Sequence, residues 1–147
     1  MTPVVAEIDT ARTEDVAGIA TILSDWIDDT PWMPRIHTRD EDRAFCAHLL
    51  AKGVRVARTG GEPAAFLARD GDKITALYVA KAQRGSGHGS ALIEDAKVAS
   101  DVLELWTFQA NTAAHAFYRR HGFTEIAETE GDNEESLPDV ELWWTRP

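Results

Sequence analysis

The chain has 147 residues, of which 44% are hydrophobic and 27% are charged, as in ordinary globular domains. It carries 15 Lys and Arg against 25 Asp and Glu, and this net charge of -10 opposes binding to nucleic acid or to anionic membrane surfaces. The one cysteine excludes an internal disulfide, and no His or Cys cluster has the spacing of a metal site, so no metal is expected.

No apolar run approaches the length that spans a membrane. The start of the chain, MTPVVAEIDTAR, lacks the basic segment followed by an apolar segment that is typical of a secretory leader. At this length a single core is the simplest arrangement. We therefore expect one domain over residues 1–147, in the cytoplasm.

The first part of the chain predicts a strand and two helices. Residues 7–12 read as the strand, and Thr13 is placed to cap a first helix. Thr38 and Glu41 match the capping box of a second helix, on whose apolar face Cys46 falls. We interpret Cys46 as a core residue and not as a nucleophile. The apolar positions of the first helix recur at helical spacing: Val16, Ile19, Ala20, Leu23 and Ile27.

The loop between the two helices contains bulky apolar side chains. Pro31 and Pro34 break any helix there, and Trp32 and Met33 stand between them. A loop that joins two helices is normally polar, so these side chains need an explanation. Either they pack down as a plug, or they line a pocket.

Strands dominate the middle of the chain. Residues 54–59 and 63–69 flank the tight turn Gly60-Gly61, which indicates a hairpin, and residues 73–79 follow as a third antiparallel strand. Helix and strand then alternate, so strands 73–79 and 102–108 should lie parallel. The remaining elements in order are a helix at about 87–99, the strand 102–108, a helix at 112–121, and an antiparallel pair at 123–129 and 140–145.

Three glycines at alternate positions mark the segment LYVAKAQRGSGHGSALI, residues 77–93. They are Gly85, Gly87 and Gly89, and they lie between an apolar strand and an apolar helix. Free N–H groups at a helix start attract anions, and glycines let a pyrophosphate approach closely. A flexible turn has the same pattern, and neither the dinucleotide fingerprint nor a nucleotide-binding Lys-Ser or Lys-Thr is present. The loop alone is weak evidence for a phosphate site.

A second motif, NTAAHAFYRRHGF, begins 22 residues after Gly89. Together with the RGSGHG loop at 84–89, it resembles the GNAT superfamily of N-acetyltransferases. That family pairs an Arg/Gln-x-x-Gly-x-Gly/Ala loop with a later Asn-x-x-Ala-x-x-Phe-Tyr-x-x-x-Gly-Phe segment. The resemblance covers roughly residues 74–126. It implies an α/β (α+β) fold with a mixed, mostly antiparallel central sheet of about seven strands, about four flanking helices and a splayed parallel strand pair.

The resemblance also implies direct acetyl transfer from acetyl-CoA, as cosubstrate, to an amine of a small molecule or peptide. The pantetheine arm would lie between the splayed strands and the pyrophosphate on the glycine loop, held mostly by backbone groups. Asn111 would hydrogen-bond the arm, although an Asx cap of the following helix explains the same residue. The implied cofactor-binding residues are Leu77, Tyr78, Val79, Arg84, Gly85, Ser86, Gly87, His88, Gly89, Ser90, Asn111 and Phe117.

Tyr118 is implied as the catalytic general acid, whose phenol protonates the departing thiolate. Adjacent helical residues point about 100° apart, so we expect Phe117 in the core and Tyr118 toward the thioester. A structural Tyr118 is the alternative. His88, His115 and His121 are expected in surface or loop positions rather than in catalysis.

No general base is evident. In many relatives a Glu on one of the splayed strands takes the proton of the amine, but the corresponding positions here hold no carboxylate: Ile74, Thr75, Trp106 and Thr107. Water relayed to Glu104 or His37, or capture of a neutral amine, remain open. A non-catalytic acyl-CoA sensor is therefore the alternative function.

The acceptor site is expected from the loop between the first two helices and from the splayed strands. We assign Trp32, Met33, His37 and Trp106 to it. Eight acids and no Lys or Arg lie between Glu125 and Glu141. They form either a solvated, self-repelling hairpin or a mouth that attracts a cationic acceptor. We expect a monomer or homodimer that binds neither nucleic acid nor membrane.

Overall fold

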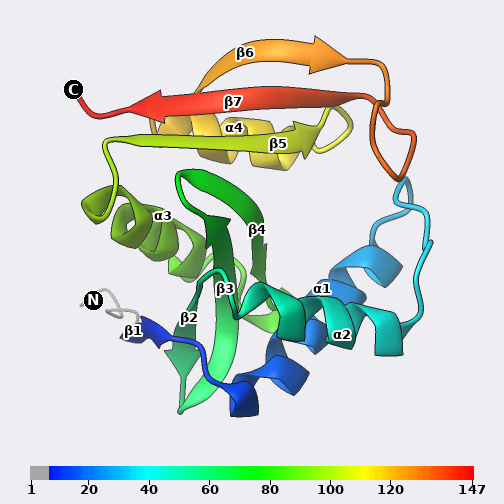
Figure 1. Ribbon diagram of the computed structural model, residues 1–147, viewed down its shortest axis with the longest axis vertical. Coiled ribbons are helices and arrows are strands. Elements are labelled where there is room, and N and C mark those ends of the chain that lie inside the picture. The colour runs from blue at the N-terminus through cyan, green and yellow to red at the C-terminus, as the bar shows by residue number, and fades with distance from the viewer. Residues whose placement is uncertain (1–6) are drawn as a thin grey trace.

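Residues 7–147 are described by a computed structural model, in which one seven-stranded sheet has the order β1-β2-β3-β4-β5-β7-β6 (Figure 1). The expected lack of a secretory leader concerns residues 1–6 in part, and these lie outside the described residues. The strands are β1 (Glu7–Thr10), β2 (Val54–Thr59), β3 (Glu62–Asp70), β4 (Lys73–Val79), β5 (Val102–Phe108), β6 (Thr124–Thr129) and β7 (Asp139–Thr145). The helices are α1 (Val16–Asp29), α2 (Arg39–Leu49), α3 (His88–Val98) and α4 (Thr112–Arg120).

The sheet consists of two antiparallel halves, β1 to β4 and β5-β7-β6, which meet at the parallel pair β4 and β5. That junction is short. Lys73 pairs with Glu104, and the backbone N–H of Glu104 donates to the carbonyl of Asp72 at 3.0 Å. Beyond it the strands of the two halves run in different directions (Figure 1). The expected mixed sheet with a splayed parallel pair is confirmed.

The hairpin of β2 and β3 follows from its turn. Gly60 and Gly61 have φ angles of 60° and 83°, and two left-handed residues in succession make the type I′ turn that suits strand twist. The capping box of α2 is also confirmed. The Glu41 N–H donates to Thr38 Oγ1 at 3.1 Å, and the Thr38 N–H donates to Glu41 Oε1 at 3.0 Å.

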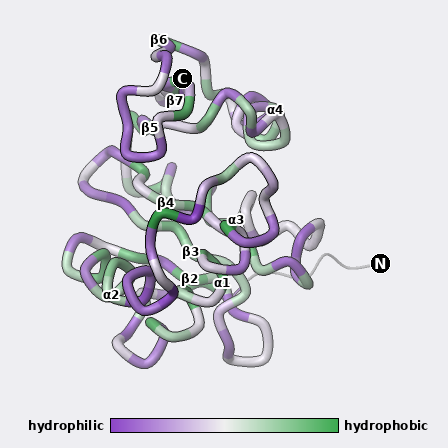
Figure 2. Tube along the Cα trace, turned by 90° about the vertical axis from the view of Figure 1, so that its right-hand side faces the viewer, coloured by the Kyte–Doolittle hydropathy of each residue, from purple (hydrophilic) through white to green (hydrophobic). Residues whose placement is uncertain are grey.

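The two faces of the sheet are covered by different helices. Val56 and Phe66 face α1 and α2, and alternate strand residues such as Ala57 and Leu67 face α3 and α4. Cys46 is fully buried on the first side, where burial raises the pKa of its thiol to about 12. This confirms its core position. Figure 2 shows the connecting loops mostly in the hydrophilic colour and the hydrophobic residues on elements such as β4.

The start of α1 differs from the prediction. Thr13 does not cap this helix, because residues 13–15 form a 3-10 turn and the helix begins at Val16. The Arg12 N–H donates to Asp15 Oδ2 at 2.8 Å. The same carboxylate accepts two hydrogen bonds of 2.8 Å from the Arg58 guanidinium. Arg58 of β2 is buried and requires a carboxylate partner, and this requirement sets where α1 starts.

Candidate active site

The glycine loop presents main-chain N–H groups to open space at the start of α3. Gly85 and Gly87 have φ angles of 81° and 87°, which favour glycine strongly, and a Cβ atom at either position would meet nothing within 4 Å. Gly87 occupies the cap position of α3 without a side-chain cap. The first N–H groups of this helix are therefore free to bind an anion, so the loop fits a diphosphate.

The two sequence motifs meet at Gly89. A Cβ at this position would lie 3.4 Å from Cζ of Phe117 and 3.6 Å from Cγ2 of Val79, so α3 packs closely on α4 and β4 here. Ser90 Oγ lies 3.0 Å from Nε2 of His121, just after α4. The loop, β4 and the Phe-Tyr helix thus form one region, although the second motif begins 22 residues after Gly89.

A cavity of about 240 Å³ lies between β4 and β5, in the gap that their divergence leaves. Leu77, Tyr78 and Trp106 line it from the strands, and Asn111 and Tyr118 line it from the cap and the last turn of α4. Asn111 Oδ1 accepts the N–H of Ala114 at 3.1 Å and so caps α4. The Asx-cap interpretation is therefore correct for Asn111, which at the same time borders the cavity.

Tyr118 is a buried phenol that borders this gap. It is 8% exposed, and its ring packs edge-on against Phe117 and Phe123, with centroids 5.2 Å and 5.4 Å away. Burial raises the pKa of the Tyr118 phenol well above its usual range. Within residues 7–147 its hydroxyl has no hydrogen-bond partner. It is a protonated donor that remains available.

The expected division between Phe117 and Tyr118 was wrong in one respect. Tyr118 is the buried residue of the two, and Phe117 is only partly buried. Phe117 lies instead between Gly89 and the ring of His121, whose centroid is 4.7 Å away. The two side chains do point in different directions from α4, as expected. Phe117, however, points toward α3 and not into the hydrophobic core.

Tyr78 supplies a second phenol. The family resemblance implied only a backbone role for Tyr78, but its ring lines the gap and also the next cavity. It packs at 5.1 Å against Trp26, and burial, followed by the charge of Glu135, raises the pKa of its phenol to about 12.

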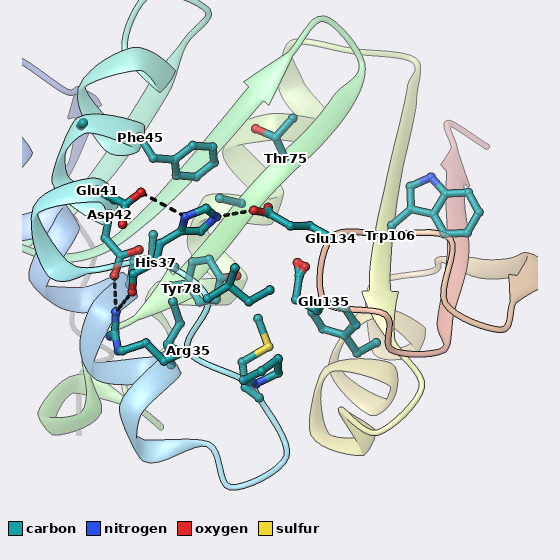
Figure 3. Close-up of a pocket in the computed structure, with 18 residues that line it drawn as sticks. Arg35, His37, Glu41, Asp42, Phe45, Thr75, Tyr78, Trp106, Glu134 and Glu135 are labelled. Atoms are coloured by element: carbon teal, nitrogen blue, oxygen red, sulfur yellow. Dashed lines mark hydrogen bonds and ion pairs between the residues drawn. The ribbon is translucent and has the colours of Figure 1, made fainter.

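A larger cavity of about 560 Å³ adjoins the gap (Figure 3). The two cavities share five wall residues, which are Thr75, Ala76, Tyr78, Trp106 and Phe108. Met33, His37 and Trp106 line the larger cavity, as the sequence interpretation proposed. Trp32 lies outside its lining and packs against Trp26 and Phe108, with centroids 5.8 Å and 5.7 Å away.

Both halves of the chain contribute charged groups to the larger cavity. His37 contacts Glu134 and lies 3.5 Å from Glu41, and these contacts, with Glu134 first, raise the pKa of the imidazole. Arg35 Nη1 donates to Asp42 at 3.0 Å. The acid-rich hairpin is thus more than a solvated loop, because Glu134 and Glu135 line the cavity.

Glu135 was missed by the sequence reasoning. Burial raises the pKa of its carboxyl, and its Oε2 is buried without a hydrogen-bond partner among residues 7–147. No pattern separates it from the seven other acids of its segment, so only the path of the β6–β7 loop identifies it.

Other candidates lie elsewhere. Glu104 is at the closed end of the β4–β5 pair and lines neither cavity. The surface position expected for His88 was wrong, because this side chain is 4% exposed, 3.4 Å from Thr59. His115 and His121 are also mostly covered, with side-chain exposures of 16% and 14%.

Comparison with known proteins agrees with this geometry. The acetyltransferase (GNAT) domain model matches residues 47–125. The peptidyl-lysine N-acetyltransferase YjaB of Salmonella typhimurium is 32% identical over 72 residues, which are 49% of this chain and 50% of that protein. The match therefore spans about half the length of this relative.

Solved structures share the fold at low identity. One is the solution structure of apo YjaB from Escherichia coli, which is 24% identical in sequence. The superposition covers 97% of this chain and 99% of the YjaB chain, with a TM-score of 0.80. Another is Ard1 from Thermoplasma volcanium, which is 18% identical. Its superposition covers 98% of this chain and 99% of the Ard1 chain, with a TM-score of 0.80. Within residues 7–147 no helix has the length and apolar composition to cross a bilayer.

The family model covers more than half of the sequence, so the chain belongs to the GNAT N-acetyltransferase family.

Proposed function

We propose that this enzyme transfers an acetyl group from acetyl-CoA directly to an amine of a small molecule or peptide, without a covalent enzyme intermediate. One observation carries the proposal. Tyr118 borders the gap, and the gap shares a wall with the larger cavity. A thioester in the gap and an amine in the larger cavity would therefore meet where the two cavities adjoin. Such positioning of two reactants is itself a large part of catalysis.

The residues that would hold the cosubstrate fit its chemistry. The N–H groups from Gly85 to Ser90 would take the pyrophosphate, and the backbone edge of Leu77 to Val79, which does not pair with β5, would pair with the pantetheine arm. Asn111, at the border of the gap, would contact the same arm. Acetyl-CoA supplies the activated acetyl group as a thioester.

Tyr118 is proposed as the general acid. Its phenol keeps its proton at neutral pH, has no hydrogen-bond partner among residues 7–147, and borders the gap where the sulfur would leave. A positioned proton transfer of this kind contributes about 10²- to 10⁴-fold to the rate.

The acceptor is proposed to be an amine on an apolar stem. Apolar residues dominate the larger cavity, and acids stand among them. The name of the Salmonella relative, a peptidyl-lysine N-acetyltransferase, supports a lysine side chain as one such acceptor, since its ammonium group ends a four-carbon stem. A free amine of similar shape is the other candidate.

The second candidate function is a non-catalytic acyl-CoA sensor. The observation that favours it is the absence of a carboxylate from Ile74, Thr75, Trp106 and Thr107, the strand positions beside the gap. The protonated and unbonded Tyr118 opposes it.

We also propose that residues 1–147 form one domain, which acts in the cytoplasm as a monomer or homodimer. A single sheet that contains both β1 and β7 supports one domain over the described residues.

The test is thiol release from acetyl-CoA in the presence of a panel of amines, for wild type and Tyr118→Phe. Amine-dependent release that falls at least about 10²-fold in the variant is expected. Binding of acetyl-CoA without turnover of any amine would favour the sensor.

A further inference from the structure

We propose that Glu135 is the catalytic base of this enzyme, and that the larger cavity takes a primary ammonium group carried on an apolar, preferably aromatic, body. This inference rests on the proposed acetyl transfer and names its acceptor class and its missing proton acceptor.

The reaction needs such a base. An alkyl amine with a pKa of about 10.4 is almost wholly protonated at neutral pH and cannot attack a thioester until it loses a proton. The residues of β4 and β5 that line the gap include no carboxylate, and Glu104 pairs at their closed end. Asp139 of β7 also lines the gap, but both of its carboxylate oxygens already accept hydrogen bonds, from Thr129 and Asn133. A base from another element is therefore required.

Glu135 is placed to fill this role. It comes from the loop between β6 and β7, and Figure 3 shows its carboxylate directed into the cavity, between His37 and Trp106. One carboxylate oxygen is buried and unpartnered among the described residues. Its neighbour Glu134 differs, because it is already engaged with His37. Buried carboxylate oxygens are normally hydrogen-bonded, so a missing donor is expected, and an ammonium group supplies one.

The surroundings of Glu135 suit a base. Burial raises the pKa of its carboxyl most, and a hydrogen bond from its own backbone N–H lowers it. Glu134 and Asp139 raise the pKa further and His37 lowers it, and the net shift is upward. Tyr78 of β4 also faces it, and Arg35, Glu41 and Asp42 are further charged groups that line the same cavity. A base with a pKa closer to the working pH is more effective, so these neighbours help Glu135.

The position relative to Tyr118 completes the arrangement. Glu135 lines the acceptor cavity, Tyr118 lines the gap, and the shared wall lies between them. The ammonium gives one proton to Glu135, which passes it to solvent. The nitrogen then forms the C–N bond as the C–S bond breaks, and the sulfur receives a proton from Tyr118, which is restored by the second proton of the nitrogen. The products are the amide, the thiol and one released proton.

The apolar body follows from what the cavity exposes. Ile36, Phe45 and Trp106 are 46%, 48% and 41% exposed, and all three line it. Large apolar side chains left accessible in a concave site typically contact a ligand. The acids Glu41, Glu134 and Glu135 lie beside them, so the ligand should be cationic as well as apolar.

The experiment uses 2-phenylethylamine as probe acceptor and 2-phenylethanol as its neutral counterpart. Binding of each is measured by calorimetry in the presence of CoA, and thiol release from acetyl-CoA is followed from pH 5 to 9. The variants are Glu135→Gln, the carboxylate-retaining Glu135→Asp, and Glu128→Gln as a matched control. Glu128 is exposed on β6, in the same acid-rich segment, and lines neither cavity. Unfolding temperatures verify that each variant folds.

For wild type we expect at least tenfold tighter binding of the amine than of the alcohol, and turnover that rises with pH as Glu135 ionises. Glu135→Gln should abolish the binding preference and lower kcat/KM at least about 10²-fold at pH 7. Its remaining activity should rise up to pH 9 with the fraction of free amine, whereas wild type should level off once Glu135 is ionised. Glu135→Asp should recover part of both, and Glu128→Gln should match wild type. If Glu135→Gln turns over the amine as fast as wild type does, Glu135 is not the base, but the proposed acetyl transfer still holds. No thiol release by wild type with any amine would overturn the transfer itself.

Discussion

His37, in the loop before α2, contacts Glu134 in the loop between β6 and β7, although 97 residues separate them in the chain. The contact joins two loops that border the larger cavity on different sides (Figure 3). The rim of the proposed acceptor site is therefore held by side chains from both ends of the sequence.

This contact makes the rim sensitive to pH. Because Glu134 first, and Glu41 after it, raise the pKa of His37, the ionic contact is complete below the unfolded value of about 6.5 and is lost as pH rises through the folded pKa. We expect Glu134→Gln to lower the midpoint of the His37 NMR titration, and Glu128→Gln to leave it in place. An unchanged midpoint in Glu134→Gln would show that the two loops are not linked in solution.

The glycine loop offers a comparison of two substitutions. Gly60 and Gly87 both have left-handed φ angles and open space around an added Cβ, so alanine should cost each about 1–2 kcal/mol of stability. Only Gly87→Ala reshapes the proposed pyrophosphate site. We expect Gly60→Ala to keep the rise in unfolding temperature on addition of acetyl-CoA and Gly87→Ala to lose most of it. Equal shifts in the two variants would remove the loop from cosubstrate binding.

Tyr118→Phe should separate catalysis from stability. The phenol hydroxyl has no partner among residues 7–147, so its removal should change the free energy of unfolding in urea by less than about 1 kcal/mol. Thiol release should nevertheless fall about 10²-fold or more. A stable variant with full activity would show that Tyr118 is only a packing residue.

The buried pair of Asp15 and Arg58 should matter for folding alone. Arg58→Met leaves the Asp15 carboxylate buried without its partner and should lower the free energy of unfolding by about 3–5 kcal/mol. The pKa of Asp15 is lowered, chiefly by its hydrogen bonds with Arg58, so the stability from this pair is present above the unfolded value of about 3.9 and is lost as pH falls through the folded pKa. Urea unfolding at pH 7 and pH 3 measures both effects. A loss at pH 7 below 1 kcal/mol would contradict them.

Much of the fold was predictable because local chemistry determines it. The Gly60-Gly61 turn sets a hairpin, the Thr38–Glu41 box sets the start of α2, and the alternation around α3 makes β4 and β5 parallel. The start of α1 was not predictable in this way, because Arg58, more than forty residues later, recruits Asp15.

In the site, too, residues in local motifs were predictable and residues placed by distant parts of the chain were not. Tyr118, Asn111 and the glycine loop lie in short motifs, and the structure brings them to one gap. Glu135 belongs to no motif, and its position depends on how the β6–β7 loop folds over the cavity. Trp32 is the kind of side chain expected in a pocket, but it packs against Trp26 and Phe108 and lies outside the lining of the larger cavity.

The most direct test of this account is a crystal structure with CoA bound, in which the distance from the thiol sulfur to the Tyr118 hydroxyl is measured. We expect the diphosphate on the N–H groups that begin α3, and the sulfur between β4 and β5 within hydrogen-bond reach of Tyr118, directly or through one water. A diphosphate bound elsewhere, or a sulfur outside the gap that Tyr118 borders, would contradict the proposed function.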